Sequence, residues 1–177
     1  MKTISIALQQ ATFRLRAKLL GHLYEYSKPL MQFIRRKRIP WHLSRKDLAQ
    51  YHTHTLGNSL YNFLITNDSE LMSRFEKHDV YHVLLGYSPT VLDEIRMSFC
   101  LVGNGKRSLY TTSVVLLGGA IFPEYLSDFR SHFQKGKKMR AFYHWNFQHL
   151  LREDKAMLVR MIMGDFPVLR HISTQQF

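Results

Sequence analysis

Apolar positions recur at three- and four-residue spacing through most of the chain, which is the period of an amphipathic helix. Segments with this pattern include residues 3–24, 28–37, 45–51, 56–65, 69–76 and 153–163. No run of residues that favours a strand has an evident partner strand elsewhere in the sequence. The pattern therefore predicts an all-α fold, a single-domain helical bundle of seven to nine helices.

Glycine, proline and capping residues predict where individual helices begin and end. Gly86 is a natural left-handed cap for a helix over residues 77–86. Ser88 and Pro89 then predict the start of the next helix, because they supply a capping hydroxyl and a proline in the first turn. We expect that helix to run to Val102.

Other segments carry mixed signals. The β-branched and aromatic residues within 107–119 favour a strand by propensity. Because no partner strand is evident, we expect a buried helix there. Residues 135–138, which read Lys-Gly-Lys-Lys, predict a basic loop, and residues 143–150 predict a further helix.

Length and cysteine content narrow the organisation of the chain. Its 177 residues suffice for one domain with its own core. The single cysteine, Cys100, excludes an internal disulfide, and its apolar neighbours predict a buried thiol. We divide the chain into a basic amphipathic helical region over residues 1–50, a helical core over residues 51–170, and a tail over residues 171–177.

Positive charge is concentrated at the N-terminal end. Residues 1–50 hold eleven Lys or Arg and two acidic residues, a net charge of +9, and the rest of the chain adds +3 to the total of +12. Such a field points to an anionic partner. Long apolar side chains stand beside the basic ones around Arg14–Arg16 and Arg35–Arg38, so we expect an anionic membrane surface. One alternative is an ordinary helix whose basic face is solvated. Binding to nucleic acid is a weaker alternative, because the sequence contains no recognisable nucleic-acid-binding motif.

The strongest chemical signal is a pair of histidines four residues apart, His78 and His82, which fall on one face of a helix. After the stop at Gly86, Glu94 can return on a neighbouring antiparallel helix. Two neutral imidazoles with one or two carboxylates suit a divalent metal. Asp79 would be either a ligand at the rim of the site or a group that orients an imidazole. The alternative is two histidines that only pack and cap.

The run HDVYH that begins at His78, followed after eleven residues by Glu94, resembles the signature HDxxH-x(11)-E. That signature marks the fourth member of the coenzyme Q (ubiquinone) biosynthesis family. The neighbouring sequence segments HVLLG and PTVLDE also resemble those of the family. Weaker similarity to the family extends from about Leu56 to Val159. Two features depart from the family: Trp145 lacks the acidic residue that often follows it, and the basic N-terminal third has no clear counterpart.

The resemblance implies a peripheral membrane enzyme of ubiquinone biosynthesis, on the cytoplasmic inner face of the membrane or on the mitochondrial matrix side in a eukaryote. It implies metal-dependent oxidative decarboxylation at ring carbon one of a polyprenylated hydroxybenzoate, alongside other quinone-biosynthesis enzymes. By carry-over, His78, Asp79, His82 and Glu94 would hold the metal, usually zinc. Asp79 or Glu94 could instead transfer the proton. The alternative to an enzyme is a non-catalytic lipid-binding scaffold that organises the quinone-biosynthesis enzymes. The sequence does not decide whether the protein forms a homodimer.

A polyprenyl tail would need a long apolar groove. Ordinary core packing explains the helical spacing of the candidate lining residues better than a groove does. These candidates follow the two motif histidines along the chain and are Leu84, Leu85, Val91, Leu92, Ile95, Met97 and Phe99.

Overall fold

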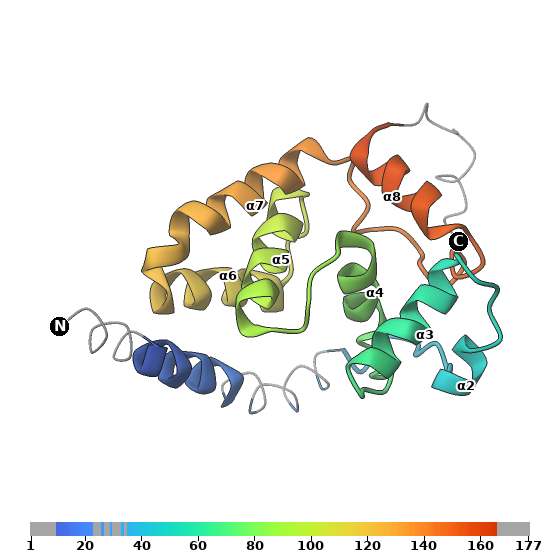
Figure 1. The fold of residues 1–177 in the computed structure, drawn as a ribbon, viewed down its shortest axis with the longest axis horizontal. Coiled ribbons are helices and arrows are strands. Elements are labelled where there is room, and N and C mark those ends of the chain that lie inside the picture. Colours follow the sequence, from blue (N-terminus) through green and yellow to red (C-terminus); the bar gives the residue numbers. More distant parts are fainter. Residues whose placement is uncertain (1–9, 23–25, 27–28, 30–32, 34, 166–177) are drawn as a thin grey trace.

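The computed structural model describes residues 10–22, 26, 29, 33 and 35–165. Within them the protein is all-α, as predicted, and contains no strand. A helix over residues 10–22 precedes eight helices in the rest of the described chain (Figure 1). These are α2 (Arg45–Leu48), α3 (Leu56–Thr66), α4 (Glu76–Leu85), α5 (Val91–Gly103), α6 (Leu109–Ile121), the 3₁₀ helix η1 (Pro123–Tyr125), α7 (Leu126–Lys138) and α8 (Lys155–Met163).

Local capping explains why several helices begin and end as predicted. Ser44 and Asp47 form a capping box that starts α2, and the Thr55 hydroxyl accepts from the backbone of α3. Gly86 ends α4 in the left-handed conformation, with φ of 73°. The predicted helix over residues 3–24 is helical where the structure describes it, and the predicted tail lies outside the described residues.

Three predicted boundaries are wrong. Residues 69–75 are not helical, because Asp68 (φ 44°) and Arg74 (φ 67°) take left-handed conformations that a helix cannot contain. The helix after Gly86 begins at Val91 with Thr90 as its cap, so Ser88 and Pro89 belong to the loop before it. Residues 143–150 form successive turns instead of a helix.

The predicted basic loop at residues 135–138 is also wrong, because α7 continues through it to Lys138. Packing against α5 explains the difference. A Cβ atom at Gly136 would overlap the carbonyl oxygen of Cys100, and one at Gly103 would overlap that of Phe133. Glycine therefore lets α5 and α7 lie in backbone contact, and this tertiary contact outweighs the low helix propensity of Gly136.

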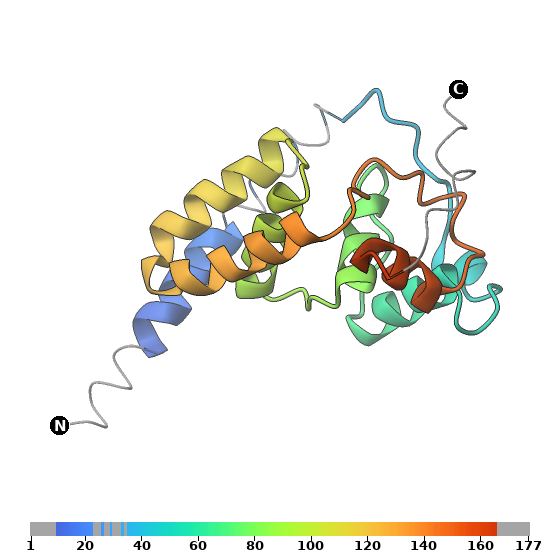
Figure 2. The same ribbon diagram turned by 90° about the horizontal axis from the view of Figure 1, so that it is seen from above.

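Two apolar clusters hold the helices together. The larger joins α2, α3, α4 and α8 with one side of α5, and it contains Cys100 at 0% exposure, the buried thiol that the sequence predicts. The smaller consists of Ile95, Phe122 and Phe129. Helix 10–22 packs on this smaller cluster through Phe13, next to α6 and η1 (Figure 2). The N-terminal helix is thus part of the fold.

The candidate groove residues divide between these clusters. Leu84, Leu85, Ile95 and Met97 are buried, which confirms core packing for them. The other three, Val91, Leu92 and Phe99, are partly buried and pack against the smaller cluster.

Helix α6 confirms the helix expected over residues 107–119, but the burial expected for it is wrong. Within α6 only Thr111 and Gly118 are buried. Among the described helices, none is long and apolar enough by itself to cross a membrane. Helix α6 passes that test only together with residues Pro123–Lys138, from which it is bent by 105°.

Candidate metal site

Helices α4 and α5 bring the two histidines and the glutamate together. His78 and His82 lie one turn apart on α4, with ring centroids separated by 4.8 Å. Gly86 turns the chain away, and the Thr90 hydroxyl then caps α5. This places Glu94 in the first turn of α5, where its carboxylate oxygens lie 3.1 Å from Nε2 of His78 and 3.0 Å from Nε2 of His82. The pairing of Glu94 with the histidines is the arrangement that the spacing predicts.

The three side chains form a group that could hold a metal ion. One ligand atom from each of His78, His82 and Glu94 lies within 4.8 Å of the other two. The His82 side chain is 1% exposed, whereas those of His78 and Glu94 are 18% and 27% exposed. Two imidazoles and one carboxylate make a three-ligand set, the number of protein ligands found in metal sites that accept an outside ligand.

The hydrogen bonds around the imidazoles orient both Nε2 atoms toward that centre. Nδ1 of His82 lies 3.0 Å from the carbonyl oxygen of Tyr87, which can only accept, so Nδ1 carries a proton and donates it. Nδ1 of His78 makes a longer contact of 3.5 Å with a carboxylate oxygen of Asp79. Metal-bound histidines usually hold their second nitrogen in this way, so the residues present fit a divalent cation.

Without a cation, the same groups form an ion-pair network. Burial opposes the charged form of His78, but hydrogen bonds to Asp79 and Glu94 outweigh it and raise the pKa of His78 to about 9. Burial also opposes the charged form of Glu94. The hydrogen bonds from His78 and His82 outweigh that effect and lower the pKa of Glu94 to about 2. Glu94 is therefore ionised at every pH at which the protein would work.

Asp79 lies outside the three-residue group. Its carboxylate contacts Nδ1 of His78 instead of facing the two Nε2 atoms. This is the position of an orienting group, one of the two roles that the sequence leaves open for Asp79. Its side chain is 18% exposed.

Three groups that contact the two histidines were not predicted from the sequence. The Phe63 ring on α3 stacks on His82 at 5.3 Å, and the Tyr110 ring on α6 meets His78 edge-on at 6.3 Å. Nothing short of the tertiary fold signals either contact. The Tyr87 carbonyl could have been suspected, because the left-handed turn at Gly86 folds the chain back over the end of α4.

Tyr87 also ties the loop between α4 and α5 to α7. Its hydroxyl lies 2.6 Å from Nδ1 of His132, whose Nε2 is 3.5 Å from Asp128. Asp128 in turn accepts from Nε of Arg96 at 2.7 Å. Arg96 also reaches Asp93 at 2.9 Å, which closes the network on α5.

Comparison of the chain with protein-family models gives no match, and comparison with curated proteins gives none either. The chain is an all-α protein in which His78, His82 and Glu94 form a cluster able to hold a metal ion.

Proposed function

We propose that the protein is a metal-dependent carboxy-lyase of ubiquinone biosynthesis. It would remove the carboxylate at ring carbon one of a polyprenylated hydroxybenzoate at a membrane surface. The supporting observation is the convergence of His78, His82 and Glu94, which are spaced as in the HDxxH-x(11)-E signature that the sequence resembles. A divalent cation held there, zinc by that resemblance, would bind oxygen atoms of the substrate and stabilise the negative charge that develops as carbon dioxide leaves.

Different side chains would bind the cation and transfer the proton. His78, His82 and Glu94 would bind the cation, so Glu94 is not available to move a proton. Asp79 orients His78 and is partly exposed. It would take up a proton from solvent and pass it to ring carbon one as the bond from that carbon to the carboxylate breaks. Tyr110 lies against His78 and offers an aromatic surface for the substrate ring.

The test combines metal content with turnover of a prenylated hydroxybenzoate supplied in micelles. His82→Ala should lose both bound metal and carbon dioxide release, because it removes the most deeply buried of the three ligands. His149→Ala, an exposed histidine outside the site, is the matched control. The mass of the product tells whether hydrogen or hydroxyl replaces the carboxylate. Full activity in a metal-free His82→Ala protein would refute the enzymatic proposal.

A non-catalytic lipid-binding scaffold is the second candidate, favoured by leucines of α6 that are largely exposed, such as Leu109 and Leu116. It would present prenylated intermediates to other quinone-biosynthesis enzymes. This function predicts that isoprenoid lipid copurifies with the protein. It also predicts that complementation survives the loss of the metal ligands.

The proposed location is the anionic inner face of a membrane. It is supported by the net charge of +9 in residues 1–50. A lipid substrate would also be concentrated there, so the location and the substrate proposal agree with each other.

A further inference from the structure

Helix α6 is uncharged along its whole length and yet lies at the surface. None of its thirteen residues is acidic or basic. Leu109, Leu116 and Leu117 are 70%, 67% and 45% exposed. An uncharged and mostly apolar helix is normally covered by other parts of a fold. Within the described part of the chain, α6 packs on α5, where Gly118 meets Ile95, and it is also contacted by Arg16 of helix 10–22 and by Arg35. The three leucines nevertheless stay exposed.

Basic side chains border this exposed face. Arg107 is exposed just before the first residue of α6. At the other end, Arg16 of helix 10–22 donates to the carbonyl of Ile121 at 3.0 Å and pairs with Glu124. A cation therefore stands at each end of α6. Among the described residues Arg107 pairs with no acidic side chain, whereas Arg16 pairs with Glu124.

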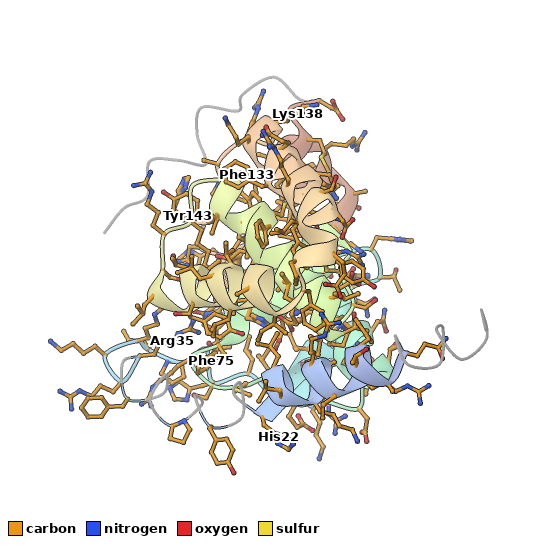
Figure 3. The ribbon with its side chains drawn as sticks, turned by 90° about the vertical axis from the view of Figure 1, so that its left-hand side faces the viewer. His22, Arg35, Phe75, Phe133, Lys138 and Tyr143 are labelled. Atoms are coloured by element: carbon orange, nitrogen blue, oxygen red, sulfur yellow. The ribbon has the colours of Figure 1, made fainter. Side chains whose placement is uncertain are left out.

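A second basic segment, the turn at residues 35–38, lies beside α6. The Arg35 guanidinium is 4.0 Å from the Phe75 ring and 5.9 Å from the Tyr110 ring of α6. Figure 3 labels Arg35 and Phe75, which appear close together in that view. The rest of the turn is exposed, and it is flanked by Phe33 and Ile39, which are 60% and 86% exposed. No acidic residue occurs in residues 26–46 or 95–123.

We propose that α6 and the turn at residues 35–38 form the surface that docks on an anionic lipid bilayer. The leucines of α6 would lie below the headgroups, and Arg107 and the turn would meet lipid phosphates. A second copy of the chain fits less well, because a symmetric contact would bring these cations against themselves. The assignment rests on the membrane location proposed above and specifies which residues carry it.

The test is flotation of the full chain with vesicles of phosphatidylcholine alone or mixed with phosphatidylglycerol. The double variant Leu109→Glu/Leu116→Glu should reduce partitioning about tenfold or more, because it places carboxylates in the apolar layer. Ile65→Glu is the matched control, since Ile65 is a 48% exposed apolar residue on α3. Arg107→Gln should weaken binding only to the vesicles that contain phosphatidylglycerol. Circular dichroism checks that each variant is folded.

The outcomes separate this proposal from the others. If the wild type does not float, the membrane location fails, while metal content measured on the same protein still decides the metal proposal. If the wild type floats and the double variant floats equally well, α6 is not the docking surface. A wild-type dimer that the double variant dissociates, without vesicle binding, would show that a second copy covers α6 and would overturn the proposal.

Discussion

Each imidazole of the candidate metal site is oriented by the acceptor that faces its Nδ1 atom. For His82 this acceptor is the Tyr87 carbonyl, and for His78 it is the Asp79 carboxylate. Both Nε2 atoms then face Glu94, which lies within 3.1 Å of each. In the metal-free protein a proton on His78 occupies the position that a cation would need, so protons and metal compete for the same atoms.

This competition predicts a metal affinity that rises with pH. Hydrogen bonds to Asp79 and Glu94 raise the pKa of His78 to about 9. Below that pH, binding must displace a proton, so the association constant should increase roughly tenfold per pH unit up to about pH 9. Titration with Co²⁺, followed by its absorption spectrum, measures the effect. Asp79→Asn should flatten the slope, and a constant affinity between about pH 7 and pH 9 in the wild type would contradict the assignment.

Lys106 gives a second pH dependence, away from the metal ligands. Burial lowers its pKa to about 7, with further lowering by Arg35, Arg38 and Lys77. Its ammonium group lies 4.1 Å from the centre of the Tyr81 ring. The ordinary pKa of a lysine is 10.5, so between about pH 7 and pH 10.5 Lys106 holds a proton in the unfolded chain that it has lost in the folded chain. The free energy of unfolding therefore rises with pH in this window.

Urea unfolding at several pH values checks this expectation. The free energy of unfolding of the wild type, relative to Lys106→Met, should increase as the pH rises from about 7 toward 10. Lys138→Met, which removes an exposed lysine at the end of α7, is the control for the loss of one positive charge. A wild-type curve parallel to that of Lys106→Met would mean that Lys106 titrates normally in the folded protein.

At the scale of helices, the predictions succeeded where a local signal marks a boundary. The αL glycine at residue 86 and the capping serine at residue 44 act on their own neighbours, so the sequence reveals them. Local signals can also compete, since Thr90 caps α5 in place of Ser88. Two other errors occur where contacts distant in sequence decide the structure. The continuation of α7 through Gly136 depends on the α5 backbone, and the exposure of α6 depends on what fails to cover it. Neither is visible in a local pattern.

The contact between α5 and α7 predicts an unequal response to alanine at two helical glycines. In Gly136→Ala the new Cβ would overlap the Cys100 carbonyl, and the helices would have to move apart. We expect a loss of about 1–3 kcal/mol or more in the free energy of unfolding. At Gly119 in α6 the nearest atom to a new Cβ is 3.4 Å away, so Gly119→Ala should be neutral or stabilise by up to about 1 kcal/mol. Equal effects at both positions would show that α5 and α7 are not in backbone contact.

At the scale of the whole molecule, the candidate metal site joins the parts of the fold that the two apolar clusters hold. Helix α4 belongs to the larger cluster, whereas Ile95, next to Glu94 on α5, belongs to the smaller. Helix 10–22 takes part in this packing as well, because Phe13 packs on the smaller cluster. A cation bound by both α4 and α5 would therefore stabilise the molecule as a unit.

Thermal and chemical unfolding with added cation tests this coupling. At a free concentration one hundred times the dissociation constant, a ligand specific for the folded state adds about 2.7 kcal/mol to the free energy of unfolding. We expect this gain in the wild type, in one transition reported both by far-ultraviolet circular dichroism and by tryptophan fluorescence. His82→Ala should show no gain, and His149→Ala should keep it. An equal gain in the free energy of unfolding of His82→Ala would mean that the stabilising cation binds elsewhere. A gain reported by circular dichroism or by fluorescence alone would mean that the parts of the fold unfold separately.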